Sequence, residues 1–455
     1  MVTSDVVQRV RLRSVCAHDP ASKLPLRSSL ADPVGLRRPQ TPLSLGNFEV
    51  GHQPRGQCGL TTVADCRQNA EGNLSGPVEF WRAGLLRVGL IGCGRWGRMA
   101  HIPAWLRDPR CQLVGVYDQD PERISSVDGL EVVGSAEELI MSGDVDVIDV
   151  VTWNPSHYQY AAAAIAHGKH VLCEKPVHHN YRLTQELADR ARAAGLRTKV
   201  GFTFRYSAAM MRMKELIDEG WVGRPLVFNG FEQNSQFLDP AVPMRAGEDP
   251  TTADGQLRAA SLEGYGAPII DLALWFTNDR PVELVGLLTN QIPERAQPGS
   301  GALANLPVDD ADCFIGRLAG GGFMTIQSSY VTVGNYPGLE ARLYGTEGAV
   351  ICRLVEEGGI TERLWVAGKD SVEFRPVEVP ERLLPSGGSL MEPWPSSFYS
   401  NLVRDFVTDI LAPDRMAGGD FEDAARVQEI IDAVELSHQQ HRWVELPLAA
   451  WAPLK

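Results

Sequence analysis

A glycine-rich turn between an apolar strand and a helix constrains this chain more than any other feature of its sequence. Residues 85–91 form a short apolar run that is typical of a buried strand in a parallel sheet. The run leads into a G-x-G-x-x-G motif, whose glycines permit a tight turn, close approach of backbone to a pyrophosphate, and packing of the helix on the strand. The following helix would direct its N–H groups and positive dipole end at the phosphates. The candidate cofactor-binding residues of this turn are Gly92, Cys93, Gly94, Arg95, Trp96 and Gly97.

A carboxylate lies where such a domain binds the ribose. A second apolar run, 113–117, ends in Asp118, about 20 residues after Gly97, which is the usual spacing of the dinucleotide-binding motif. A carboxylate there accepts hydrogen bonds from both ribose hydroxyls and repels a 2′-phosphate. The sequence therefore favours NAD over NADP, although Arg123 brings a positive charge nearby.

Strand-like and helical segments continue to alternate after this unit. Runs at 145–151, 170–173 and 198–202 are strand-like, and helical patterns separate them. This alternation predicts an α/β fold with a doubly wound parallel sheet, whose ligands bind at the carboxyl ends of the strands. Thr152 to Asn154 and Glu174-Lys175 lie at such ends.

The second half follows a different pattern. From residue 207 onward, strand-like runs at 224–234, 282–290, 314–331 and 341–354 follow one another, and helices are expected near 398–410 and 421–438. We therefore expect an α+β domain with an open, mostly antiparallel sheet. The expected domains are a Rossmann domain at 85–205 and an α+β domain at 206–455.

The first 84 residues lack both hydrophobic periods and contain many Pro, Ser, Gly and Gln residues. We expect a disordered extension, because such a composition cannot bury a core. Two alternatives remain: a targeting peptide, against which Asp5, Asp19 and Asp32 argue, and a translation start near Val78 or Leu85.

The amino-acid composition argues against several classes of binding partner. The formal net charge of −14 argues against nucleic acid and against an anionic membrane surface. No apolar run approaches the roughly 20 residues that span a bilayer. The eight cysteines contain no C-x-x-C, which predicts no metal site, no disulfide framework and a reducing, cytoplasmic setting.

Two motifs carry a resemblance to a known family. The segment N-P-S-H at 154–157, followed by G-K-H-V-L-C-E-K-P at 168–176, resembles the Gfo/Idh/MocA oxidoreductases. The segments 201–206, 220–223, 345–348 and 444–448 are also similar, so that the resemblance covers about residues 85–450. It implies an NAD(P)-dependent dehydrogenase or reductase acting on CH–OH groups of a sugar or polyol. It also implies a homo-oligomer, because the family often pairs its open sheets.

The resemblance also implies roles for particular residues. Lys175 would sit beside the nicotinamide and the reacting carbon, where a cation favours alkoxide character at the substrate oxygen. Arg205 and Tyr265 are candidates for binding substrate. The residues expected to line the cofactor are Thr152, Trp153, Asn154, His157, Glu174 and Lys175.

One departure affects the acid/base chemistry. Many family members carry D-x-G-x-H-x-x-D, but here Gly264 replaces the first Asp, Pro268 replaces the His, and only Asp271 remains. No histidine occurs between His179 and His438. The substitutes considered are Tyr265, Glu263, His178 and Lys175. We expect Tyr265 to act, with a nearby cation lowering the pKa of its phenol, and Asp271 to contact substrate or to act electrostatically at a helix start.

Three functions therefore remain open. The first is NAD-dependent hydride transfer to or from a sugar, cyclitol or related polyol or ketone. The second is a glycoside-cleaving enzyme that retains its NAD and uses transient oxidation. The third is a non-catalytic ligand-binding regulatory protein of the same fold, which Gly264 and Pro268 favour.

Overall fold

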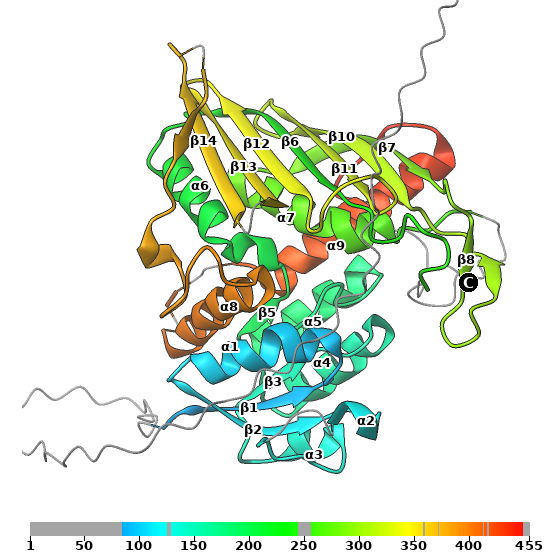
Figure 1. Cartoon of the computed structure of the whole chain (residues 1–455), viewed down its shortest axis with the longest axis vertical. Helices are drawn as coiled ribbons and strands as arrows, with labels where there is room; N and C mark the ends of the chain where they lie inside the picture. Colours follow the sequence, from blue (N-terminus) through cyan, green and yellow to red (C-terminus); the bar gives the residue numbers. More distant parts are fainter. Residues whose placement is uncertain are drawn as a thin grey trace, which may run out of the picture. The chain divides into compact units, whose positions relative to one another are not determined.

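The computed structural model describes residues 84–124, 129–243, 256–357, 360–371, 373–412, 414–415 and 418–448 (Figure 1). The extension expected at 1–84 therefore lies outside the described residues, except for Gly84. In the part that is described, no helix combines the length and apolar character needed to cross a membrane.

A parallel sheet forms the first domain, as the alternation of strands and helices predicts. Its strand order is β2-β1-β3-β4-β5, and the paired strands are parallel throughout. The bounds are β1 Leu86–Ile91, β2 Cys111–Tyr117, β3 Val147–Val150, β4 His170–Cys173 and β5 Thr198–Val200. The chain changes direction along the sheet between β1 and β3, which is the switch point where such sheets bind ligands.

Helices flank this sheet on both faces (Figure 1). They are α1 Ile102–Arg107, α2 Pro121–Ile124, α3 Ala136–Met141, α4 His157–Ala166 and α5 Tyr181–Ala193. A π-helix, Gly97–His101, precedes α1, and short 3-10 turns at Asn154–Ser156 and Thr203–Tyr206 follow β3 and β5. The doubly wound Rossmann arrangement is thus confirmed.

The second sheet is mixed and mostly antiparallel. Its order is β15-β14-β13-β12-β6-β11-β10-β7-β16, and only β6 and β11 are described as a parallel pair within it. The bounds are β6 Pro225–Gln233, β7 Pro281–Thr289, β10 Ala311–Leu318, β11 Phe323–Ser329, β12 Leu339–Gly345, β13 Gly348–Glu357, β14 Ile360–Gly368, β15 Arg375–Val377 and β16 Val444–Glu445. A separate hairpin joins β8 Glu294–Ala296 and β9 Leu303–Asn305.

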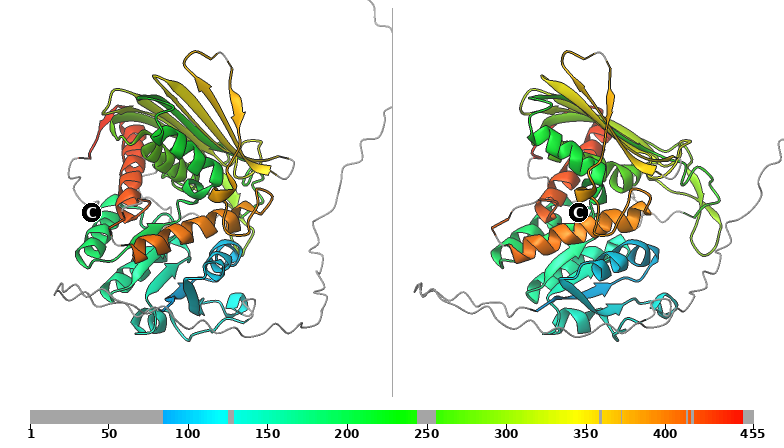
Figure 2. Two further views of the ribbon diagram at one scale, coloured as in Figure 1. Left: turned by 90° about the vertical axis from the view of Figure 1, so that its left-hand side faces the viewer. Right: turned by 60° about the vertical axis from the view of Figure 1, so that its left-hand side comes forward.

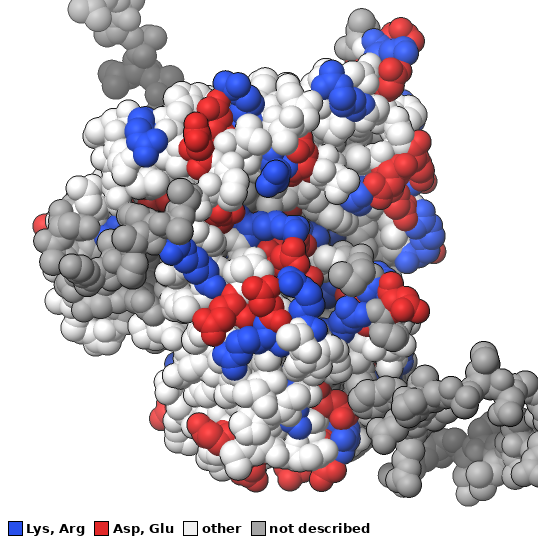
Figure 3. Space-filling view, turned by 180° about the vertical axis from the view of Figure 1, so that it is seen from behind, with Lys and Arg blue, Asp and Glu red and all other residues white. Residues whose placement is uncertain are grey.

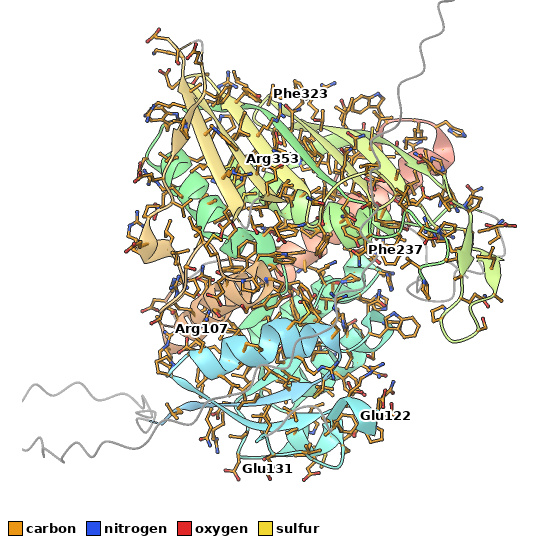
Figure 4. All side chains as sticks on the ribbon, viewed as in Figure 1. Arg107, Glu122, Glu131, Phe237, Phe323 and Arg353 are labelled. Atoms are coloured by element: carbon orange, nitrogen blue, oxygen red, sulfur yellow. The ribbon has the colours of Figure 1, made fainter. Side chains whose placement is uncertain are left out.

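Helices cover one face of this sheet and leave the other open (Figure 2). The covering helices are α6 Ala208–Asp218, α7 Ala267–Thr277 and α9 Phe421–Gln440, whereas α8 Trp394–Leu411 packs on α1 of the first domain. In β10, buried Phe314 alternates with exposed Ile315, as a half-buried strand requires. Phe323 of β11 also lies on the open face, turned away from the Rossmann sheet (Figure 4).

Charges of both signs are interspersed on the face shown in Figure 3. This face therefore carries no continuous basic stripe of the kind that nucleic-acid binding uses.

Candidate active site

The glycine turn after β1 shows which glycines the fold needs and which one leaves space. Gly92 has φ +112°, and a Cβ there would lie 2.5 Å from the carbonyl oxygen of Val151. A Cβ on Gly97 would collide with the carbonyl oxygen of Gly92. By contrast, no described heavy atom lies within 4 Å of the Cβ position of Gly94. The turn is therefore packed tightly beneath and open above Gly94, as close approach of a pyrophosphate requires.

Asp118 ties this turn to the end of β2. Its side chain is buried, and its Oδ2 accepts a hydrogen bond of 2.8 Å from the backbone N–H of Cys93. Its Oδ1 accepts one of 2.9 Å from the N–H of Asp120 and lies 3.7 Å from Nη1 of Arg123. The carboxylate is thus fixed beside the turn, with a guanidinium on its outer side.

A buried ionic network lies beneath the turn, and sequence reasoning missed it. The π-helix carries His101, whose Nδ1 lies 2.8 Å from Oδ2 of Asp149 in β3 and whose Nε2 lies 3.2 Å from Oε1 of Glu174. Trp105 donates to the same Asp149 oxygen at 2.6 Å, and the hydroxyl of Tyr399 in α8 donates to Glu174. The network therefore joins the first helix, two strand ends and α8.

The network carries a proton at neutral pH. Burial alone would lower the pKa of His101, but the adjacent carboxylates of Asp149 and Glu174 outweigh it and raise that pKa to about 9. Burial would likewise raise the pKa of Glu174, but hydrogen bonding and charge from His101 lower it. His101 is consequently an imidazolium held between two carboxylates.

Lys175 connects the two domains at the carboxyl end of β4. Its Nζ donates a hydrogen bond of 2.6 Å to the backbone carbonyl of Gly264, which precedes α7 in the second domain. Around this contact lies a cavity of about 1080 Å³ with lining residues from both domains, including Phe237, which Figure 4 labels. The predicted site residues that line it are Trp96, Thr152, Trp153, Asn154, His157, Glu174, Lys175 and Tyr265.

The loop after β3 leads to three side chains that line the cavity and differ in burial and in their contacts. Nδ1 of buried His157 lies 2.7 Å from the carbonyl oxygen of Pro176, and its Nε2 lies 2.9 Å from that of Thr152. Burial lowers the pKa of His157, and its two ring nitrogens link the loops that follow β3 and β4 through these carbonyl contacts. Trp153 is 51% exposed, and Oδ1 of Asn154 is buried without a partner among the described residues.

The tyrosine expected to exchange a proton lies in the cavity, but its environment differs from the expectation. The hydroxyl of Tyr265 donates to Gln236, and its ring packs against Tyr330 and Tyr336. Burial raises the pKa of Tyr265 well above its ordinary value, and the charge of Glu232 raises it further. The expected lowering of this pKa by a nearby cation is therefore wrong.

The structure does not bring Arg205 and Asp271 to the cavity. Nε and Nη2 of Arg205 lie 2.5 and 2.6 Å from the two carboxylate oxygens of Asp271, and both side chains are buried. Asp423 of α9 makes a further contact of 3.1 Å with the same guanidinium. These contacts join the 3-10 turn after β5 to α7 and α9, whereas Lys175 and Tyr265 do share the cavity.

The other residues considered for acid/base chemistry differ in their contacts and in their positions at the cavity. Glu263 lies 2.7 Å from Nδ1 of His179 at the cavity wall. Pro268 lies in the first turn of α7 and presents a side chain that transfers no proton. Glu232 of β6, which sequence reasoning also missed, is buried and lines the same cavity. In the described ranges, no cluster of three or more potential metal ligands occurs.

Comparisons with known proteins agree with this geometry. A family model described as "Oxidoreductase family, NAD-binding Rossmann fold" matches residues 86–202, and one described as "GFO/IDH/MocA C-terminal domain" matches 210–351. An inositol 2-dehydrogenase of Saccharopolyspora erythraea is 37% identical over 163 residues, which are 35% of this chain and 46% of that protein. This chain therefore spans about half the length of the curated relatives it matches.

Solved structures extend the likeness across both domains. An NAD-binding oxidoreductase from Klebsiella pneumoniae is 26% identical with a TM-score of 0.70, over 80% of this chain and 100% of that one. An oxidoreductase domain protein from Kribbella flavida is 26% identical with a TM-score of 0.71, over 81% of this chain and 100% of that one. With both family models matched in order, the chain belongs to the Gfo/Idh/MocA family of oxidoreductases, with an NAD-binding Rossmann domain.

Proposed function

We propose that this chain is an NAD-dependent dehydrogenase that oxidises a hydroxyl group of a cyclitol, sugar or related polyol, or reduces the matching ketone. The observation that carries the proposal is the cavity in which Lys175 lies beside the cofactor loops and reaches Gly264 of the second domain. The inositol 2-dehydrogenases to which about a third of this chain is similar support a cyclitol or a similar polyol as substrate.

The residues present fit a nicotinamide dinucleotide. The open space above Gly94 suits a pyrophosphate, and the fixed carboxylate of Asp118 suits the ribose hydroxyls. The buried, unpartnered Oδ1 of Asn154 offers an acceptor to an amide group such as that of nicotinamide. When bound, the coenzyme supplies the hydride acceptor or donor. We propose NAD rather than NADP, because a 2′-phosphate would meet the charge of Asp118.

Lys175 would act on the oxygen of the reacting carbon. An ammonium group has three N–H donors, and the described contacts direct one of them to the carbonyl of Gly264. A further donor is therefore available to a substrate hydroxyl or carbonyl oxygen in the cavity. A fixed cation stabilises negative charge that develops on that oxygen during hydride loss, and it polarises a carbonyl in the reverse direction.

The loops around Lys175 hold it in place. His157 bridges the carbonyls of Thr152 and Pro176, and the network of His101 fixes Glu174 beside Lys175. This arrangement leaves the ammonium little freedom to move, so the cation is preorganised for the reaction.

A substrate panel tests the proposal. Calorimetry should show NAD binding without substrate, and one or more of the cyclitols, sugar alcohols and aldoses should then give steady formation of NADH. NAD binding without turnover on any of them would contradict the proposal and favour the regulatory protein that Gly264 and Pro268 suggest. Turnover of a glycoside without net NADH would contradict it in favour of the glycoside-cleaving function.

A further inference from the structure

One glutamate faces the cavity without the partners that its neighbours have. Glu232 lies on β6, where Phe228, Gly230 and Glu232 alternate as the buried residues of the strand. Its side chain is 1% exposed, it lines the cavity, and its Oε2 is buried with no hydrogen-bond partner in the described part of the chain. Buried polar atoms are nearly always satisfied, so an orphaned carboxyl oxygen calls for an explanation.

The other glutamates that line the cavity in the described residues are already engaged. Glu174 contacts His101 and Tyr399, and Glu263 contacts His179. Glu435 accepts a hydrogen bond of 2.6 Å from the backbone N–H of Ala259. Among these four carboxyl groups, Glu232 is thus the one with a buried oxygen available to a group that enters the cavity.

The surroundings of Glu232 suit proton exchange. Lys175 is the charged group whose field acts on it, and the hydroxyl-bearing rings of Tyr265 and Tyr336 feel its charge in turn. Burial raises the pKa of Glu232 well above its ordinary value, while Lys175 opposes this. A carboxyl group whose protonated form is favoured by burial, beside a cation that favours its charged form, can both hold and release a proton, which is what a general acid/base needs.

We propose that Glu232 is the catalytic residue that exchanges the hydroxyl proton of the substrate, in place of the histidine whose position Pro268 occupies. The proposal rests on the proposed function. In oxidation, the substrate C–H bond breaks and its hydride reduces the nicotinamide of NAD, while the O–H bond breaks and its proton passes to an oxygen of Glu232. The C–O bond becomes a carbonyl. In reduction, protonated Glu232 returns that proton to the carbonyl oxygen as the hydride arrives.

A catalytic role for Glu232 predicts that its substitution by Gln lowers turnover while it raises stability. A purely structural role predicts that the substitution lowers stability. Glu232→Gln keeps the size of the side chain but removes the titration. We expect its turnover to fall by at least ~10²-fold, the lower range of general acid/base contributions, with little change in NAD affinity. Its melting temperature should rise relative to the wild type as pH increases above the ordinary glutamate pKa, because the variant never buries that charge.

Glu362→Gln is a matched control. Glu362 is also a buried carboxyl group whose pKa burial raises, but it accepts hydrogen bonds of 2.6 Å from Ser207 and 2.7 Å from Ala209 and does not line the cavity. We expect this variant to lose stability and to keep its turnover. A second variant, Glu232→Ala, should recover turnover with added formate, whereas a structural role gives no such rescue.

The outcomes separate this inference from the proposed function. Turnover of Glu232→Gln within about twofold of an active wild type, or a fall in its melting temperature that is independent of pH, would overturn the role of Glu232 alone. A wild type that turns over no substrate in the panel would overturn both. Loss of turnover with pH-dependent stabilisation, and rescue of Glu232→Ala by formate, would support the proposal.

Discussion

The buried imidazolium of His101 should make the stability of the fold depend on pH in one defined window. The pKa of His101 is raised from an ordinary value near 6.5 to about 9, so the folded state binds this proton more tightly than the unfolded chain does. Its contribution to stability is therefore complete below pH 6.5 and is lost as pH rises through 9. In His101→Gln, we expect the free energy of unfolding to lack this decrease between pH 6.5 and about 9.

The magnitude follows from the width of that window. Each pH unit between the unfolded and folded pKa values corresponds to about 1.4 kcal/mol. The window of pH 6.5 to about 9 therefore gives a contribution on the order of 3 kcal/mol. His101 is fully buried, so solvent does not screen its contacts with Asp149 and Glu174.

His170 provides a control of opposite sign. Burial lowers the pKa of this half-buried histidine to about 4, so its contribution is lost as pH falls below 6.5. Urea unfolding followed by tryptophan fluorescence, at intervals from about pH 4 to about pH 9.5, would measure both windows. The difference in unfolding free energy between wild type and His101→Gln should shrink from pH 6.5 to 9, whereas that for His170→Gln should change below pH 6.5. A difference for His101→Gln that stays constant across that range would refute the charged network.

Three further results are expected. Asp118→Ala should narrow the preference for NAD over NADP in calorimetric titrations, and tighter binding of NADP by the wild type would contradict the ribose assignment. Gly94→Ala should weaken NAD binding without lowering the melting temperature, whereas Gly97→Ala should cost about 1–3 kcal/mol of unfolding free energy, because its Cβ meets backbone; equal melting curves would contradict this distinction. Tyr265→Phe should retain most of its turnover if Glu232 exchanges the proton, and loss comparable to that of Glu232→Gln would return the role to the tyrosine.

Local patterns were sufficient to predict much of the fold. Apolar runs bounded by turn residues located the parallel strands, and the glycine turn of Gly92, Gly94 and Gly97 follows β1 at the carboxyl edge of the sheet, where the sequence predicted it. Consecutive strand-like runs after residue 207 predicted the mostly antiparallel sheet. These features depend on neighbouring residues, so the sequence expresses them directly.

Contacts between distant segments were not predictable in the same way. His101 reaches Glu174 only because a π-helix turns it inward, and Tyr399 comes from a helix more than 200 residues further along the chain. The pairing of Arg205 with Asp271 likewise depends on how two domains pack.

Burial determined the electrostatic environment of two residues in the cavity, which the sequence analysis did not predict. Tyr265 lies where the sequence suggested, but desolvation moves its pKa in the direction opposite to the one expected. Glu232 did leave a signal, since it is a charged residue at an inward position of a strand with period-two alternation. A search for such positions would have found it.

The most direct test of the central claim is the turnover of Lys175→Met with NAD and the best substrate of the panel, measured beside its affinity for NAD. We expect a fall in turnover of at least ~10²-fold with a much smaller change in NAD affinity, because the glycine turn and Asp118 are proposed to hold the other end of the coenzyme. Lys369→Met, at an exposed lysine paired with Glu347, should behave as the wild type. Normal turnover in Lys175→Met would contradict the proposed role of Lys175 at the reacting carbon.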